Sequence, residues 1–460
     1  MKTVMFLCLS LVVGMCRAQD LNRMDQVIQA YVGHQHFMGS VLVARGNDAM
    51  LSKGYGFANV ELKIPNSPET KFRLGSITKQ FTAASIVLLE QQGKLKTEDS
   101  VKKYLPDAPA TWDKITIFHL LTHTSGIPEF MEGYTADLEA TKTMPATPEQ
   151  LVARFRDKPL NFAPGEKFSY SNSGYVLLGY LIEKISGHSY AQFVQENLFT
   201  PLGMKDSGYD DSNSAIIVRR ASGYVPRSDG PMNAGFVSSA FSAGALYSTT
   251  EDLLRWEQGL FGGKVLSEAS LRKMTTPYKG DYAFGLFVST LNGRKAIWHD
   301  GYMQGFSASL VYYPEDKLTV AVLGNLKWAS TPNEIASKLG ALAHGEKVEL
   351  PASGERKEIT LSRDVLSRYT GTYDFEPGAN LLIKLEGDQL SAKLGGQPWT
   401  PIYPESETMF FLKIADAQLE FRKDTKGAVT GIVMHQGGRH HDAPRKSSTI
   451  ELPPVPGTQM

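Results

Sequence analysis

Cysteine is almost missing from this sequence. Only two cysteines, Cys8 and Cys16, occur in 460 residues, and both lie near the N-terminus. Residues 1–18 are typical of a cleaved export signal, because a basic residue precedes the apolar run 4–13 and the small residue Ala18 ends the segment. The mature chain would then contain no cysteine, which excludes disulfides, thiol nucleophiles and cysteine-ligated metal sites.

An excess of charge of one sign is missing too. The whole chain has 48 Lys and Arg residues against 48 Asp and Glu residues. Removal of Lys2 and Arg17 with the signal leaves 46 basic against 48 acidic residues, a net charge of about −2. This balance provides no basic surface for nucleic acid or anionic lipid. Because residues 1–18 would direct export and no later apolar stretch is long enough to span a membrane, we expect a periplasmic or secreted protein.

Strand patterns begin and end the region 19–345, and helix patterns fill its middle. A hairpin is expected over residues 39–45 and 50–54. Four further strands are expected later, over residues 283–288, 295–298, 306–313 and 318–323. This order predicts an α+β domain in which one antiparallel sheet is assembled from both ends of the region.

The composition changes after residue 345. Residues 346–362 are charged and contain proline and glycine, which indicates a linker, and the proline-rich residues 447–460 are expected to be disordered. Between them, residues 363–446 carry short alternating segments separated by turns. Even spacing without helices predicts a small all-β barrel or sandwich. The expected strands are 371–375, 381–385, 390–394, 409–414, 418–422 and 429–435.

A serine and a lysine one helical turn apart, Ser76 and Lys79, stand at the start of a long apolar helix pattern. A hydroxyl beside an amine on one helix face is a nucleophile with a base within reach. The spacing is not rare, because Ser100 and Ser270 also precede a lysine by three residues. Taken alone, it favours a serine that caps a helix beside a surface lysine, and the rest of the sequence has to decide.

A hydrolase built on Ser76 would need a further acid or base and donors for an oxyanion. The pattern Tyr-x-Asn occurs once, at Tyr170-Ser171-Asn172, in a polar turn. A third element would be a cationic or hydrogen-bonding residue two positions before a glycine on a strand edge. Of four such places, only His299-Asp300-Gly301 follows one expected strand and precedes another. The other three begin at Lys338, Lys393 and His435.

With these elements in order, the chain resembles the penicillin-recognising serine hydrolases related to class C β-lactamases. That group includes D-alanyl-D-alanine carboxypeptidases, D-aminopeptidases and family VIII esterases. The resemblance covers roughly residues 25–345 and implies a β-lactamase/transpeptidase-like domain. The matching segments are Phe72-Arg73-Leu74-Gly75-Ser76-Ile77-Thr78-Lys79, Leu120-Leu121-Thr122-His123-Thr124-Ser125-Gly126, residues 164–172, Pro201-Leu202-Gly203-Met204, Ser242-Ala243-Gly244, residues 248–253 and His299-Asp300-Gly301.

The resemblance implies a role for each site residue. Ser76 would be acylated, Lys79 and Tyr170 would share general-base work, and Tyr170 would protonate the leaving group. Asn172 would hold the substrate amide, and the backbone N–H groups of Ser76 and Tyr302 would form the oxyanion hole. The expected reaction is acyl transfer to serine followed by hydrolysis, without metal or cofactor. The substrate would be a small peptide, amide or ester.

Two residues depart from the class C pattern. His299 stands where those β-lactamases usually have lysine, and histidine is more typical of the peptidases of the group. Asp300 stands where a small hydroxyl residue often helps to bind a substrate carboxylate. If Asp300 faces the cleft, its charge would disfavour free C-terminal carboxylates and β-lactams, at a cost on the order of 1 kcal/mol. Amino-terminal D-residues, amides or esters would then be preferred.

The segment Tyr369-Thr370-Gly371-Thr372-Tyr373 resembles the start of the lipocalin-like barrel that follows several peptidases of this group. Such a barrel either limits substrate size through a loop or serves stability and homo-oligomerisation, and both alternatives stay open. The leading hypothesis is a D-amino-acid-directed peptidase. An esterase and a weakly catalytic penicillin-binding-like protein are the alternatives.

Overall fold

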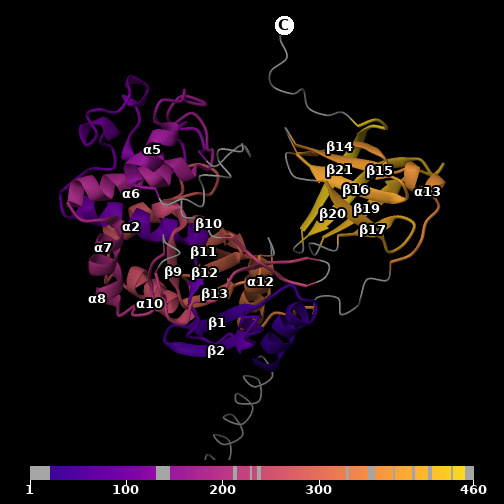
Figure 1. The fold of residues 1–460 in the computed structure, drawn as a ribbon, viewed down its shortest axis with the longest axis horizontal. Coiled ribbons are helices and arrows are strands. Elements are labelled where there is room, and N and C mark those ends of the chain that lie inside the picture. The colour runs from indigo at the N-terminus through magenta and orange to yellow at the C-terminus, as the bar shows by residue number, and fades with distance from the viewer. Residues whose placement is uncertain are drawn as a thin grey trace, which may run out of the picture. The chain divides into compact units, whose positions relative to one another are not determined.

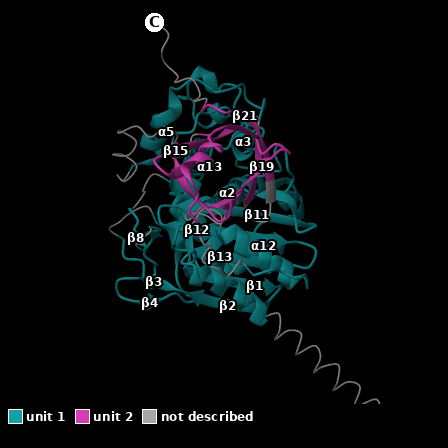
Figure 2. Ribbon diagram, turned by 90° about the vertical axis from the view of Figure 1, so that its right-hand side faces the viewer, with its two compact units in different colours: residues 1–351 teal, residues 352–460 magenta. Residues whose placement is uncertain are grey.

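The protein is described from a computed structural model that divides into two compact units, residues 1–351 and 352–460 (Figure 2). The structure describes residues 21–130, 146–210, 215–227, 230–235, 240–327, 331–350, 358–376, 379–395, 399–412, 417–436 and 439–450. The expected signal 1–18 and residues 451–460 of the expected tail lie outside them. In the described ranges, no helix combines the length and apolarity that a bilayer crossing requires.

The first unit is built on one six-stranded antiparallel sheet, in the order β10-β11-β12-β13-β1-β2 (Figure 1). Strand β1 pairs with β13 in unbroken register from Gly39↔Gly324 to Arg45↔Leu318, which joins the two ends of the domain. This topology confirms the α+β prediction. The strands are β1 (Gly39–Arg45), β2 (Asp48–Tyr55), β10 (Phe287–Leu291), β11 (Arg294–Met303), β12 (Phe306–Tyr313) and β13 (Leu318–Gly324).

Each face of the sheet is covered by a separate apolar layer. Alternate strand residues point to opposite faces. Ile297, Phe306 and Leu310 belong to the large cluster shared with the central helices. Ala296 and Val311 belong to a smaller cluster shared with the helix over residues 21–33 and with α12 (Thr331–Ala343). Odd-numbered residues of β11 therefore face the large cluster, and even-numbered residues face the smaller one.

Helix α2 (Thr78–Gln91) is the buried centre of the helical layer, and eleven of its residues are buried, among them Lys79. A helix that is enclosed by the core has no exposed polar stripe, so even Gln80, Thr82 and Ser85 of α2 are buried. Helix α6 (Asn172–Ser186) packs beside it. The Ser171 side chain caps α6 by accepting from the Gly174 N–H, and Gly187 ends the helix at φ 75°.

Two strand expectations in this unit are wrong at their ends. Strand β11 does not stop at Trp298, because its pairing with β12 continues from Ile297↔Tyr312 to Met303↔Phe306. Strand β10 begins at Phe287 instead of residue 283, since Gly285 takes φ 70° and turns the chain just before it. Strand length here is set by the partner strand and not by local composition.

The second unit is a closed barrel of eight strands in sequential antiparallel order. Six strands match expected segments, and the barrel prediction is confirmed. β17 and β21 were missed because prolines and charged residues mask their alternation. The buried interior includes Tyr369, Tyr373 and Phe421. The strands are β14 (Gly371–Glu376), β15 (Ala379–Glu386), β16 (Gln389–Leu394), β17 (Thr400–Pro404), β18 (Met409–Phe411), β19 (Ala417–Lys423), β20 (Val429–Gln436) and β21 (Arg439–Ser447).

Candidate active site

Ser76 lies in a short 3₁₀ turn, η1 (Gly75–Ile77), that runs directly into α2. Neither η1 nor α2 has a side-chain cap, so the alternative of a capping serine does not apply. The Ser76 Oγ instead lies 3.1 Å from the Lys79 Nζ. The other two Ser-x-x-Lys pairs are structural, because Ser100 caps a 3₁₀ turn and Lys273 pairs with glutamates.

The Lys79 ammonium group is buried where three elements meet. Its Nζ lies 2.8 Å from the Asn172 Oδ1 at the start of α6. It lies 2.9 Å from the carbonyl oxygen of Ala243 in α9 (Phe241–Gly244). Burial lowers the pKa of Lys79 from 10.5 to about 7, although the charges of Glu129 and Asp300 raise it. A buried amine with this pKa can exchange a proton at neutral pH.

Tyr170 lies next to the same ammonium group. The Lys79 Nζ is 4.8 Å from the centroid of its ring, and its hydroxyl forms a side-chain hydrogen bond with Ser76. Burial raises the pKa of Tyr170 well above 10, although the bond with Ser76 lowers it. Tyr170 therefore keeps its proton at neutral pH, and Lys79 is the group that titrates.

His123 packs against the turn that carries Tyr170. Its Nδ1 accepts a 3.0 Å hydrogen bond from the Ser171 N–H, and its ring lies 4.3 Å from the Tyr170 ring. Burial lowers the pKa of His123 well below 6.5, which keeps the ring neutral. His123 therefore fixes the turn that carries Tyr170, a contact that the sequence analysis did not predict.

Glu129 was missed by the sequence analysis and lies at the edge of the site. Its Oε2 accepts from the backbone N–H of Asn172, and its charge raises the pKa of both Lys79 and Tyr170. The residue follows the segment Thr124-Ser125-Gly126 by three positions, which was the available signal. Nothing local indicates that this loop meets the start of α6.

The far end of β11 offers a free strand edge beside Ser76. Pairing with β10 ends at Phe287↔Trp298, so the next five residues of β11 pair with β12 alone among the described strands. Two glycines let this edge approach η1. A Cβ on Gly301 would lie 1.9 Å from the Leu74 carbonyl oxygen, and one on Gly75 would lie 2.6 Å from the Tyr302 nitrogen. The backbone nitrogens of Ser76 and Tyr302 therefore come close together.

His299 is completely buried beneath this edge and is electrically neutral. Its Nδ1 lies 2.6 Å from the Asp300 carbonyl oxygen, which can only accept, so Nδ1 carries the proton. Its Nε2 then accepts from the Tyr282 hydroxyl at 3.3 Å. Burial lowers the pKa of His299 to about 4, against the raising effect of Asp300. His299 thus supplies no positive charge to a substrate at neutral pH.

Asp300 and Tyr302 point to the other face of the sheet, toward α12, as the alternation of β11 requires. The Asp300 Oδ2 accepts from the Asn333 Nδ2 at 3.0 Å, and its side chain is 26% exposed. The Asp300 charge nevertheless raises the pKa of Lys79 and Tyr170. Asp300 therefore influences the site through its charge, from the edge of the sheet. The sequence analysis missed Tyr282, which contacts His299, and Asn333, which contacts Asp300.

Comparisons with known proteins match both units of the chain. A family model described as Beta-lactamase matches residues 24–343, and a model described as a domain of unknown function, DUF3471, matches residues 355–446. Penicillin-binding protein 4* of Bacillus subtilis is 30% identical over 463 residues, which cover 93% of this chain and 99% of that protein. Both units therefore have counterparts in one relative.

Two solved structures share the fold. The octameric penicillin-binding protein homologue from Pyrococcus abyssi has a TM-score of 0.64 and 27% identity, and the match covers 92% of this chain and 100% of that chain. A D-stereospecific amidohydrolase from Streptomyces sp. has a TM-score of 0.60 and 26% identity, over 70% of this chain and 98% of that chain. The chain therefore belongs to the β-lactamase-fold family of serine hydrolases, which includes penicillin-binding proteins and D-stereospecific amidohydrolases.

Proposed function

We propose that this protein forms an acyl-enzyme on Ser76 and hydrolyses peptides or amides that contain D-amino acids. The observation that carries the proposal is the set of partners around the Lys79 Nζ. Asn172 Oδ1 and the Ala243 carbonyl oxygen can only accept hydrogen bonds. A neutral amine has two N–H groups, which these acceptors take, and one lone pair. That lone pair is left for the Ser76 hydroxyl at 3.1 Å.

The proton path follows from these contacts. Neutral Lys79 removes the Ser76 proton as the oxygen attacks the carbonyl carbon, and the N–H groups of Ser76 and Tyr302 stabilise the oxyanion. Tyr170 donates its proton to the leaving group and regains a proton from the charged Lys79, so that both groups end the step neutral. Water then attacks the acyl-enzyme with the same groups in reverse roles. Asn172 fixes the amine and is available to a substrate amide.

The charges around the site support D-residue amides over substrates with a free C-terminal carboxylate. His299 is neutral, and the carboxylates of Asp300 and Glu129 lie near Lys79. A substrate carboxylate bound near His299 would be repelled by the carboxylates of Asp300 and Glu129. Neutral His299 would provide no positive charge to offset this repulsion. The D-stereospecific relative supports the D-configuration, whereas the geometry serves amide and ester cleavage alike. A carboxylesterase is therefore the second candidate.

Matched chromogenic substrates test the proposal. We expect hydrolysis of D-alanyl p-nitroanilide and p-nitrophenyl esters, slow turnover of a chromogenic cephalosporin, and preference for D over L. Ser76→Ala should abolish all three activities, whereas Ser270→Ala, which alters another Ser-x-x-Lys pair, should change none. Activity that survives Ser76→Ala would refute the mechanism. Ester cleavage without amide cleavage would favour the esterase, and acylation by penicillin without turnover would favour a penicillin-binding protein.

We further propose that the protein is exported and forms homo-oligomers. Residues 1–18 support export, and the octameric homologue supports assembly. N-terminal sequencing of secreted protein should begin at Gln19, and light scattering should give a mass above the 50.6 kDa of one chain. Retention of the first 18 residues or a monomeric mass would refute the respective proposal.

A further inference from the structure

We propose that a pocket beside the Ser76 turn, containing Arg73 and Arg220, binds a carboxylate on the acyl side of the substrate. The inference rests on the proposed function and names its preferred substrates, which are acylated D-residues with an acidic group on the amino-terminal side. The pocket has a volume of about 330 Å³, and its lining also includes Ser222, Gly223 and Asn233.

Two guanidinium groups of the pocket share one buried carboxylate. Arg73 Nε and Arg220 Nη1 both contact the carboxylate of Asp210, each at 2.9 Å, and Asp210 is buried. The Nη2 and Nε of Arg220 have no partner among the described residues, and its side chain is 22% exposed. A planar guanidinium with free donors suits a carboxylate.

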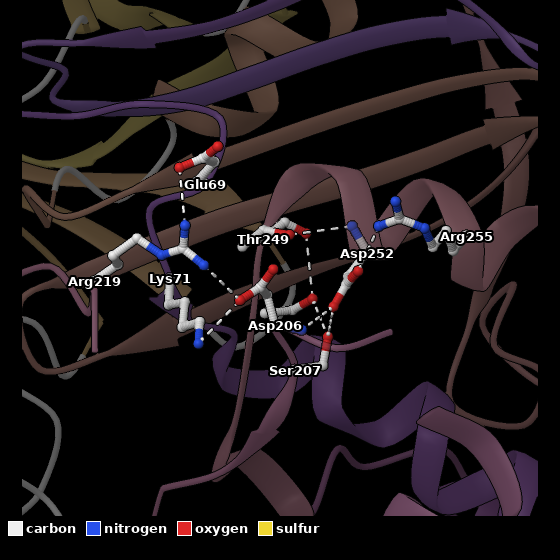
Figure 3. A network of polar contacts seen from close by, with 9 residues as sticks. Glu69, Lys71, Asp206, Ser207, Arg219, Thr249, Asp252 and Arg255 are labelled. Atoms are coloured by element: carbon white, nitrogen blue, oxygen red, sulfur yellow. Dashed lines mark hydrogen bonds and ion pairs between the residues drawn. The ribbon is translucent and has the colours of Figure 1, made fainter. Parts of the chain in front are cut away.

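The segment that carries Arg220 is fixed in place before any ligand binds. Figure 3 shows Arg219 between Glu69 and Asp206, with Lys71 reaching the same aspartate. The Lys71 N–H donates to the Arg219 carbonyl at 2.9 Å, and the Ala221 N–H donates to the Lys71 carbonyl at 3.0 Å. Arg220 is therefore held from both sides, which lowers the entropic cost of binding a ligand.

The same network continues to the start of α10 (Thr250–Phe261). The Asp206 N–H and the Ser207 hydroxyl both donate to the Asp252 Oδ2, at 2.8 and 2.9 Å. Asp252 in turn pairs with Arg255 (Figure 3). The wall of the pocket is thus tied to a helix of the core instead of being a free loop.

The position of the pocket identifies the acyl side. The leaving group departs toward Tyr170, whose ring lies 6.3 Å from that of His299, at the near end of the free β11 edge. The acyl chain must then extend toward the other end, past Met303 to the turn at Gly305. Gly223 of the pocket packs on Gly305, and a Cβ on Gly305 would lie 2.7 Å from the Gly223 Cα.

Arg73 also lies on the same face of the sheet as Ser76. Met303 and Phe306 are paired and therefore share the face of Gly301, which meets η1. The Arg73 guanidinium lies 5.6 Å from the centroid of the Phe306 ring. Arg73 lies three positions before Ser76 in the sequence. A group attached to the acyl carbon can therefore reach the pocket without crossing the sheet.

The rim of the pocket favours a single negative charge. The Asn233 Nδ2 donates to the carboxylate of Glu61, and Tyr224 donates to the same carboxylate. A group with two negative charges would be repelled by the Glu61 carboxylate more strongly than a group with one. The rim thus favours a carboxylate over a phosphate monoester.

The test compares two D-alanyl p-nitroanilides that differ only in the charge of an N-linked cap, succinyl or the uncharged succinamyl. We expect wild-type kcat/KM to be roughly 10-fold or more higher with the succinyl cap, as for a charge-assisted hydrogen bond. Arg220→Ala should bring the ratio near 1. Arg272→Ala, which removes an exposed arginine of α11 (Glu268–Met274), should leave it unchanged.

Arg220→Ala leaves the buried Asp210 with one partner fewer, so a second variant is needed. Asn233→Asp adds a negative charge at the exposed rim, keeps the ion pairs and should also lower the ratio. A wild-type ratio near 1, or a ratio unchanged in both variants, would overturn the inference. Calorimetry of Ser76→Ala protein with N-succinyl- and N-succinamyl-D-alaninamide measures the same charge preference without turnover. If the Ser76→Ala protein binds the succinyl ligand more tightly but the wild type cleaves no substrate, only the proposed function is refuted and the pocket proposal stands.

Discussion

Replacement of Glu129 by Gln should make the enzyme more active in mild acid. Burial lowers the pKa of Lys79 from 10.5 to about 7, which corresponds to about 5 kcal/mol. The Glu129 charge opposes this shift. Glutamine keeps an oxygen that can accept from the Asn172 N–H but removes the charge, so the pKa of Lys79 should fall by about one unit.

The magnitude follows from the fraction of neutral Lys79. At pH 6 about 10% of the amine is neutral with a pKa of about 7, and about 50% with a pKa of about 6. If neutral Lys79 is the base, kcat/KM should rise about fivefold at pH 6 and change little at pH 8. If Glu129 were instead a catalytic acid, its replacement by Gln should lower kcat/KM at pH 6.

The assay is a pH profile of kcat/KM for a D-alanyl p-nitroanilide between pH 5 and 9. The acidic limb should lie near pH 7 in the wild type and move to lower pH in Glu129→Gln. Glu149→Gln removes the same charge from an exposed position in α5 (Pro148–Arg156) and should not move the limb. An acidic limb that stays in place or moves upward in Glu129→Gln would refute the assignment of Lys79 as base.

Three further predictions concern single residues. Gly301→Ala should nearly abolish kcat with either amide or ester, because its Cβ would lie 1.9 Å from the Leu74 carbonyl oxygen; unchanged kcat would contradict the close approach. Asp300→Thr should raise kcat/KM about fivefold for substrates with a free C-terminal carboxylate relative to their amides, and an unchanged ratio would contradict its electrostatic role. Burial raises the pKa of Glu257 from 4.5 to about 8. The folded state therefore holds a proton that the unfolded chain releases, and stability falls between about pH 4.5 and 8 by up to about 5 kcal/mol. Glu257→Gln should flatten this decline in urea titrations, and an unchanged slope would contradict it.

Local patterns predicted the elements whose interactions are local. The spacing of Ser76 and Lys79 is one helical turn, and the helix places them 3.1 Å apart as expected. Ser171 caps α6 because a cap needs only its own three neighbours. Strand ends were less predictable, since β11 extends to Met303 through pairing with β12, and β21 contains Pro444 yet pairs with β20. Those hydrogen bonds come from residues distant in the sequence.

The sequence by itself determined the family of the catalytic domain, the order of its motifs and the presence of a second, all-β unit. Helical and strand periodicities are properties of neighbouring residues, and they suffice for this. Only the tertiary structure decided that Lys79 has a pKa near 7, that His299 is neutral and that Glu129 lies beside the site. Burial and charge proximity depend on chain segments that meet only in the folded protein, so no local pattern encodes them.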